Sequence, residues 1–275
     1  YWLVNSKPKK ISSFGTLTHF TSANAPEGSS QHCLDGCLVS NTCKFYAPRI
    51  YIDIIPLIHV ARKGGSSFIR FLAYLALEQP RIFKTLKSFI PSIRRLSDYE
   101  GWPVSTISED TSQKGRYEVL KNGPYGRCVY KCDNDVVDHQ IVGIDFENGV
   151  TANLTMHGHS HEEGRTIRID GTKGTIIGEF TSSGVFLVLY DHLSGKKRII
   201  LRTRMQEGHG GGDEGQIQAF IQLLKEKNKQ ANPLTSARAS LESHLMAFAA
   251  EESRVSGKTI FMDEFRDKLK LKMFT

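Results

Sequence analysis

Residues 136–156, VVDHQIVGIDFENGVTANLTM, contain the turn that decides the fold. Apolar and polar side chains alternate on both sides of Asn148-Gly149, a residue pair typical of a type I′ turn. So short a connection joins only strands that pair antiparallel. We therefore expect an antiparallel hairpin, with strands at 136–146 and 150–156.

Further segments with a two-residue period lie on either side of this hairpin, and Ser194-Gly195 joins two of them in the same way. The other expected strands are 10–20, 127–132, 166–170, 175–180, 185–192, 197–204 and 259–262. Apolar residues fall on both faces of 141–146 and 185–190, which favours burial of a sheet face against another copy of the chain. We therefore predict a homo-oligomer.

Helical periodicity is found in three regions. Apolar residues recur every three or four positions between Ile50 and Leu96, with prolines and glycines between them, which predicts a helical insertion at about 50–98. Helices are also expected at 214–227 and 235–256, the second ended by Gly257. The predicted fold class is α+β: a large, mostly antiparallel sheet with helices packed on one face, the other face serving oligomerisation, plus the helical insertion.

The composition argues against several classes of protein. The 275 residues carry a net charge of +7, but the Lys and Arg residues are scattered, so nucleic acid is not an expected partner. No apolar segment is long enough to span a membrane. Five cysteines, an odd number in a chain of this length, favour a reducing compartment, and we expect the cytoplasm.

Two nucleotide-binding motifs are not found in their usual context. Neither Gly-x-Gly-x-x-Gly nor Gly-x-x-x-x-Gly-Lys-Ser/Thr directly follows an expected strand, so a self-sufficient dinucleotide or nucleoside-triphosphate site is not expected. The first residues have no initiating Met and no signal-peptide pattern, and we interpret them as an internal position of a longer chain.

A glycine-rich turn at 208–215 precedes the expected helix at 214–227. Asp213 and Gln216 have the spacing of a capping box, so this turn is interpreted as a capped helix start and not as a phosphate site. His209 in the same turn is a candidate to hydrogen-bond a substrate hydroxyl, and a turn without a ligand is the alternative.

Three cysteines, Cys33, Cys37 and Cys43, lie in one loop. With Cys132, or Cys128 in its place, they could hold a structural zinc ion in a tetrahedral site. Free buried thiols are the alternative interpretation.

Histidines offer two weaker candidates for metal binding. His32 is a further possible ligand of the cysteine site. His157, His159 and His161 alternate at a strand end and could share one face, although solvated side chains explain the same pattern.

Four polar residues in neighbouring expected strands could bind a polyhydroxylated ligand through charge-assisted hydrogen bonds: Arg127, Tyr130, Asp138 and His139. Arg127 and Tyr130, together with His209, are the candidate substrate-binding residues. An internal pair between Arg127 and Asp138 would explain those two residues equally well.

Several segments resemble the C-terminal domain of the Gfo/Idh/MocA oxidoreductases, the family that includes glucose-fructose oxidoreductase and inositol dehydrogenase. Residues 165–174, RTIRIDGTKG, are similar to its I-x-G-T-x-G strand pair. Residues 1–4, YWLV, are similar to the end of its D-x-x-R-W-L helix, with Tyr1 where the family commonly has Arg. The other similar segments are 32–47, 128–140, 208–213 and 236–242.

The resemblance implies that residues 1–275 form a substrate-binding and oligomerisation domain that works with an N-terminal Rossmann domain outside this chain. It also implies hydride transfer between NAD or NADP and a sugar, polyol or related hydroxy compound. The family's catalytic lysine and histidine would precede Tyr1, so no catalytic or cofactor-binding residue is named, and the chain alone is expected to be inactive. The alternative function is a non-enzymatic sugar-sensing or scaffold module whose basic helical insertion docks a partner or a membrane surface.

Overall fold

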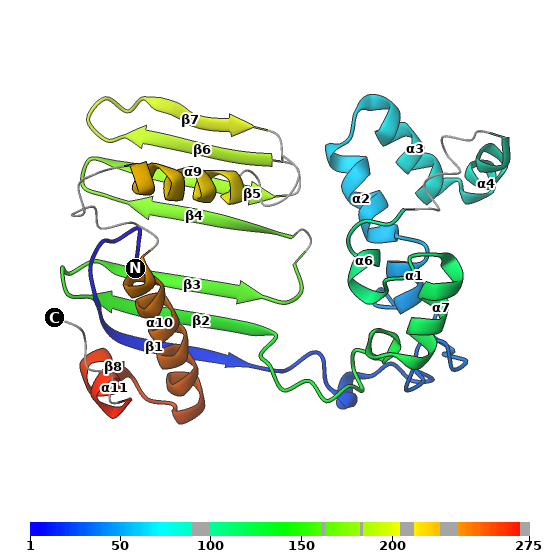
Figure 1. The fold of residues 1–275 in the computed structure, drawn as a ribbon, viewed down its shortest axis with the longest axis horizontal. Coiled ribbons are helices and arrows are strands. Elements are labelled where there is room, and N and C mark those ends of the chain that lie inside the picture. The colour runs from blue at the N-terminus through cyan, green and yellow to red at the C-terminus, as the bar shows by residue number, and fades with distance from the viewer. Residues whose placement is uncertain (90–98, 161–162, 182–183, 204–211, 226–235, 270–275) are drawn as a thin grey trace. The chain divides into compact units, whose positions relative to one another are not determined.

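The structure is a computed structural model that describes residues 1–89, 99–160, 163–181, 184–203, 212–225 and 236–269. Within these residues the strands form two four-stranded sheets, and neighbouring strands pair antiparallel (Figure 1). The chain divides into two compact units, one made of Tyr1–His19, Asn134–Ser160 and Gly211–Thr275, the other of Phe20–Asp133 and His161–Gly210.

The first sheet has the strand order β3-β2-β1-β8. Its strands are β1 (Pro8–Thr16), β2 (His139–Phe146), β3 (Thr151–His157) and β8 (Ile260–Phe261). The β2–β3 pair is the hairpin expected from the sequence, and Gly149 in its turn has a φ of +82°. The Asn-Gly signal at this turn therefore predicted the pairing correctly.

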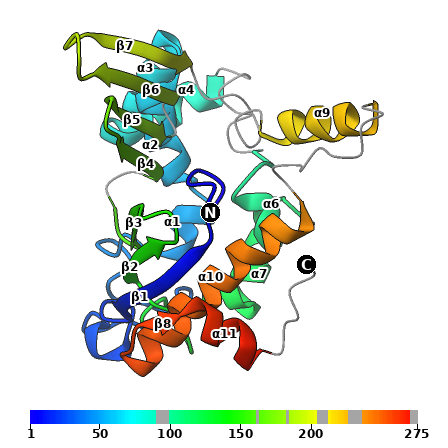
Figure 2. The same ribbon diagram turned by 90° about the vertical axis from the view of Figure 1, so that its left-hand side faces the viewer.

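Two helices pack against the first sheet, α10 (Ala237–Ser256) and α11 (Met262–Lys268) (Figure 2). The core between them consists of Ile11, Val142, Leu245, Ala249, Ala250, Met262 and Phe265. Helix α10 starts where Ser236 Oγ accepts a hydrogen bond from the Ala239 amide at 3.2 Å. It ends at Gly257, whose φ of +69° confirms the helix stop predicted for this residue. The helix expected at 214–227 is α9 (Gly212–Lys225).

The second sheet has the order β4-β5-β6-β7. Its strands are β4 (Gly164–Asp170), β5 (Gly174–Thr181), β6 (Gly184–Asp191) and β7 (Lys197–Thr203), and the register between β6 and β7 shifts at Leu187/Val188. The α+β class and the antiparallel pairing are confirmed. One large sheet was expected, whereas the described strands are hydrogen-bonded as two sheets of four.

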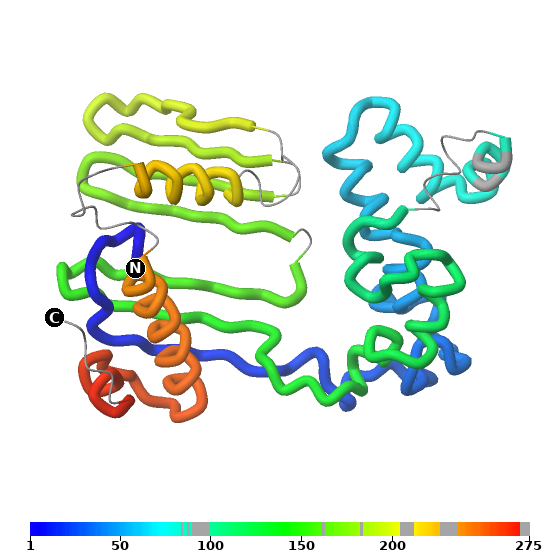
Figure 3. The backbone as a smooth tube through the Cα atoms, viewed as in Figure 1, coloured from blue at the N-terminus to red at the C-terminus, as the bar shows by residue number. Residues whose placement is uncertain are grey.

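A helical region lies between β1 and β2 in the chain (Figure 3). Its helices are η1 (Ser22–Asn24), α1 (Ala47–Tyr51), α2 (Ile55–Gly64), α3 (Ser67–Glu78), α4 (Pro80–Phe89), α6 (Val104–Ile107), α7 (Gln113–Asn122) and η3 (Pro124–Gly126). A small core formed by Cys33, Ala47, Ile107 and Leu120 joins the cysteine loop to α1, α6 and α7. The insertion is thus present, and it continues beyond the predicted boundary at residue 98.

The strand predicted at 127–132 is wrong. This segment follows η3 as a turn and pairs with the cysteine loop instead of a sheet, since the Cys128 amide donates to Gln31 O at 2.8 Å and the Cys33 amide donates to Gly126 O at 2.8 Å. A Cβ at Gly126 would lie 1.6 Å from Leu120 O, so only glycine allows this close reversal of the chain.

Candidate functional site

Strand alternation gives the second sheet a polar face and an apolar face. In β4 the polar residues Thr166 and Arg168 alternate with Ile167 and Ile169, so the two pairs point to opposite faces. The pairing register sets one row of the polar face across all four strands: Thr166, Glu179, Phe186 and Arg202. The corresponding row of the other face is Ile167, Gly178, Leu187 and Leu201.

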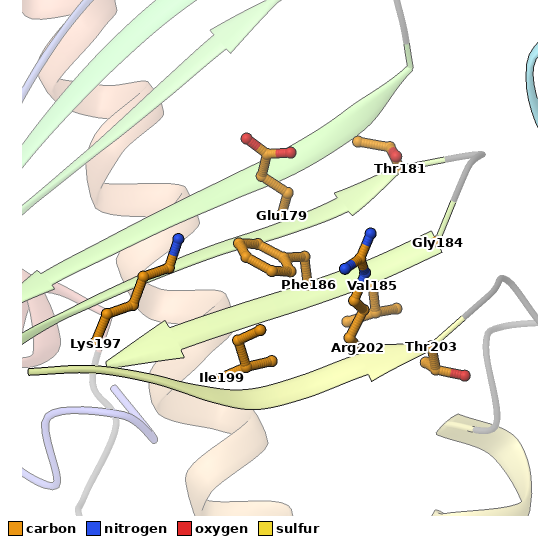
Figure 4. A pocket seen from close by; sticks show the side chains of 9 residues that line it. All are labelled: Glu179, Thr181, Gly184, Val185, Phe186, Lys197, Ile199, Arg202 and Thr203. Carbon is orange, nitrogen blue, oxygen red and sulfur yellow. The ribbon is translucent and has the colours of Figure 1, made fainter. Parts of the chain in front are cut away.

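A pocket of about 420 Å³ lies over the polar row. Figure 4 shows that the side chains of Glu179, Lys197 and Arg202 surround the ring of Phe186. A carboxylate accepts hydrogen bonds from hydroxyl groups, an ammonium and a guanidinium donate them, and an aromatic ring offers an apolar floor. This combination suits a small polyhydroxylated ligand, so we take this pocket as the candidate functional site.

Sequence reasoning missed Glu179, Lys197 and Arg202. The signal that could have found them is the period-two alternation, because it places Glu179 and Phe186 on the same face once the β5–β6 hairpin is assigned. The shift in register within β7 hides the contribution of Lys197 and Ile199 from such a count.

His209, the first predicted substrate-binding residue, lies outside the described residues. In the sequence it follows the last residue of β7, Thr203, by six positions, and Thr203 lines the pocket.

The two other predicted substrate-binding residues, Arg127 and Tyr130, lie together beside the cysteine loop. Arg127 Nη2 is 2.7 Å from Asp133 Oδ1, and this bond holds the pKa of Asp133 below its ordinary value. Tyr130 is 7% exposed, its ring lies about 6 Å from those of Phe20 and Phe45, and burial raises its pKa. Neither Arg127 nor Tyr130 is among the described residues that line the pocket of the second sheet.

Asp138 is a buried carboxylate at the start of β2. It accepts hydrogen bonds from the amides of Thr18 and His19 and lies 2.8 Å from His139 Nδ1. The partner of Asp138 is therefore not Arg127, the alternative that the sequence left open. Through these hydrogen bonds the carboxylate holds residues 18–19, which follow β1, against the start of β2.

The histidines near Asp138 form two pairs. His157 lies opposite His139 across β3 and β2, and the rings of His19 and His159 are 5.3 Å apart. His161 lies outside the described residues. The predicted alternation of His157 and His159 thus places them in different pairs.

Four cysteines, Cys33, Cys37, Cys43 and Cys128, line one small cavity together with Tyr130 and other residues of the loop. The Sγ atom of Cys132 instead donates to Val129 O at 3.3 Å. Of the two candidates for a fourth thiol, the structure therefore places Cys128 with the loop. Burial raises the pKa of Cys33, and the three neighbouring thiols raise it further, while the Ala47 amide opposes them.

All five cysteines are free thiols. Across the described ranges, no three His, Cys, Asp or Glu side chains are arranged to hold a metal ion, so the predicted zinc site finds no support here. Two buried polar atoms of the loop, Ser29 Oγ and His32 Nδ1, have no hydrogen-bond partner among the described residues. Also among the described residues, no helix has the length and apolar character needed to cross a membrane.

Comparisons with known proteins connect this geometry to a family. The family described as "Oxidoreductase family, C-terminal alpha/beta domain", of the Gfo/Idh/MocA group, matches residues 104–262, more than half of the chain. A comparison with curated proteins found no match.

One similar solved structure is described provisionally as an NADPH-dependent oxidoreductase from Desulfitobacterium hafniense. It is 15% identical, with a TM-score of 0.38, and the similarity covers 50% of this chain and 40% of that one. The matched part therefore spans less than half the length of that protein.

Proposed function

We propose, from the premise that this chain belongs to the Gfo/Idh/MocA oxidoreductase family through its C-terminal α/β domain, that it forms the substrate-binding and oligomerisation part of an NAD(P)-dependent oxidoreductase. The substrate would be a sugar, a polyol or a related hydroxy compound. The observation that carries the proposal is the family match over residues 104–262. The polar pocket of the second sheet supports it, because its side chains suit hydroxyl groups.

The described residues do not themselves fit a dinucleotide. A dinucleotide site of the usual kind lies at the carboxyl ends of parallel strands, where a glycine-rich turn opens a helix. Every strand pair among the described residues is antiparallel. We therefore assign nicotinamide binding to another part of the complete enzyme. In this proposal the residues of this chain bind the substrate and take no chemical part in hydride transfer.

In the proposed role, the pocket holds the substrate and does not react with it. Glu179 would accept hydrogen bonds from substrate hydroxyls, and Arg202 and Lys197 would donate to substrate oxygens. Fixing the substrate in one orientation is what hydride transfer requires of such a wall. His209, Arg127 and Tyr130 remain candidate substrate-binding residues from the sequence.

The test measures oxidation of a panel of sugars and polyols, with NAD and with NADP, by the full-length protein that carries this chain. Glu179→Gln and Arg202→Gln should each raise KM about tenfold or more, because each removes a charged hydrogen-bonding partner. Arg168→Gln is the matched control, because Arg168 lies on the same sheet face but pairs with Asp170 at 2.7 Å and does not line the pocket.

An unchanged KM in both pocket variants would overturn the assignment of the pocket. The 275-residue chain alone should show no turnover in the same assay, and turnover by it would contradict the division of labour proposed above. Failure of the full-length protein to oxidise any compound of the panel would count against the substrate class.

The apolar face of the second sheet is the proposed oligomerisation surface. Ile167, Ile169 and Leu201 on this face are between 37% and 45% exposed. A second copy of the same face would bury them in a two-fold contact, with Arg165 and Arg198 of this face at the starts of β4 and β7. The five free thiols favour a reducing compartment, and we propose the cytoplasm.

A further inference from the structure

Helices α2, α3 and α4 carry a strong excess of positive charge. Between residues 55 and 89 the chain has six Lys or Arg residues and a single acidic residue, Glu78. Arg62 Nη1 pairs with Glu78 Oε1 at 2.8 Å, so the one carboxylate is already neutralised within the helices. Arg70 and Arg81 are exposed to solvent.

The same helices expose large apolar side chains. Phe68 is 66% exposed, Phe71 55%, Ile82 51% and Phe89 80%. The two core clusters found among the described residues include no residue of these three helices. Aromatic and aliphatic groups are therefore presented outward beside the cations, which is the composition of a helix surface that lies in a membrane interface.

An apolar groove lies within this helical group. Its volume is about 460 Å³, and residues such as Ile54, Ile58, Leu72 and Phe83 line it. Arg62 and Arg81 directly follow two further lining residues, Ala61 and Pro80. Apart from Asp53 and Gln113, the walls of the groove are apolar and suit a hydrocarbon chain.

We propose that α2, α3 and α4 dock this protein on an anionic membrane surface. The exposed phenylalanines enter the boundary between headgroups and acyl chains, the groove receives part of an acyl chain, and the Arg70 and Arg81 side chains contact lipid phosphates. A second copy of the same helices is a poor occupant, because two surfaces of equal positive charge repel each other in a two-fold contact.

The test uses the 275-residue chain in co-sedimentation with two kinds of vesicle, pure phosphatidylcholine and phosphatidylcholine mixed with phosphatidylserine. The chain should bind the mixed vesicles at least tenfold more tightly, and added salt should release it. Arg70→Gln combined with Arg81→Gln should weaken binding roughly fivefold for each cation removed. Phe68→Ser combined with Phe71→Ser should weaken binding at low and at high salt concentration alike, since this loss is not electrostatic.

The matched control is Lys173→Gln combined with Lys196→Gln, which removes two exposed cations from the turns of the second sheet instead. It should change binding less than twofold. Equal losses in the two charge-removing variants would overturn the proposal, because binding would then follow net charge alone. Absence of binding to mixed vesicles, or equal binding to both kinds, would overturn it as well; circular dichroism checks that each variant is folded.

Discussion

Glu242 on α10 and Arg266 on α11 form an ion pair at 2.8 Å, with side chains only 2% and 5% exposed. Glu242 Oε1 and Arg266 Nε have no hydrogen-bond partner among the described residues, so the pair is buried with part of its hydrogen-bonding capacity unused. Such a pair contributes little net stability, but removing Glu242 leaves the buried Arg266 with the exposed Asp263, 2.8 Å from its Nη1, as its remaining ionic partner among the described residues. It fixes how α11 lies against α10.

Glu242→Ala should therefore destabilise the fold by about 3–5 kcal/mol, measured as the free energy of unfolding in urea. Glu252→Ala is the control, because Glu252 pairs with the exposed Lys268 and its loss should cost less than about 1 kcal/mol. The double replacement Glu242→Leu with Arg266→Met should recover most of the loss. Similar effects of the two single variants would contradict the interpretation of a buried pair.

Cys33 should make the stability of the fold depend on pH. Burial raises the pKa of its thiol, so at alkaline pH the unfolded chain loses this proton before the folded chain does. The folded state then binds more protons, and its stability should fall as the pH rises above the ordinary thiol pKa. Cys33→Ala should lessen that fall, measured by urea unfolding across the alkaline range.

Alkylation with iodoacetamide, followed residue by residue by mass spectrometry, checks the same property in the folded protein. Cys33 should react more slowly than Cys37, because it is more buried and burial raises the pKa of its thiol. Equal rates for the two thiols would show that Cys33 is not protected.

At the scale of elements, the β2–β3 hairpin depends on the backbone of Gly149. A Cβ added there meets nothing within 4 Å, so any effect of Gly149→Ala arises from its φ of +82° and not from a clash. We expect a loss of about 1 kcal/mol in thermal or urea unfolding. Gly143→Ala in β2 is the control, since a Cβ added there would lie 3.9 Å from the nearest heavy atom, Ser12 O, and the φ of Gly143 is not positive. This variant should keep or slightly raise stability. An equal loss at both positions would contradict the turn argument.

The elements that the sequence predicted correctly are those with a strong local signal. Gly149 and Gly257 have positive φ values that few other residues adopt, and the turn and the helix stop were placed correctly. The predicted type I′ turn is wrong, because that type needs a positive φ at Asn148 too, and only Gly149 has one. Helix α7 was missed because its sequence, QKGRYEVLKN, is polar and contains a glycine. Its buried face is completed by Arg116, which is 1% exposed and donates to the carbonyls of Thr111, Tyr51 and Tyr99. A buried arginine is invisible to a pattern of apolar residues.

The candidate site was less predictable than the elements. The sequence located a cysteine cluster but named Cys132 before Cys128 as its fourth member, since spacing along the chain does not show that the reversal at Gly126 brings Cys128 to the loop. The pocket residues Glu179 and Arg202 lie on β5 and β7, which are not adjacent in the sheet. Only the register of both strands against β6 brings the two side chains together. Long-range pairing of this kind is not encoded in a local pattern.

At the scale of the whole molecule, the apolar face of the second sheet predicts self-association. Ile167→Arg places a charge in the proposed interface and should convert the oligomer to a monomer, measured by light scattering after size-exclusion chromatography. Thr166→Arg is the matched control, because the neighbouring residue of β4 points to the polar face and the oligomer should persist. A monomeric wild-type chain, or dissociation by both variants, would contradict the sheet-to-sheet contact.

The prediction of one large sheet also belongs to this scale. Tight turns specify which strands follow each other, as at Asn148-Gly149 and Ser194-Gly195, and those pairings are correct. The relation between β3 and β4 is not set by such a turn. The sequence therefore predicted the pairs joined by tight turns, but neither the pairs of β1 with β2 and β8 nor the division into two sheets.

The helical region enters the fold between two strands that are hydrogen-bonded neighbours. Thr16 at the end of β1 lies opposite His139 at the start of β2, so the two ends of segment 17–138 are one strand spacing apart. Closing so long a loop costs on the order of 3 kcal/mol more than closing a turn of a few residues, which is a modest barrier. Gain, loss or exchange of the whole segment would leave the register of β1 against β2 untouched. In evolution, relatives can therefore differ at this junction by an entire module, and in protein engineering it is the place to graft a foreign domain.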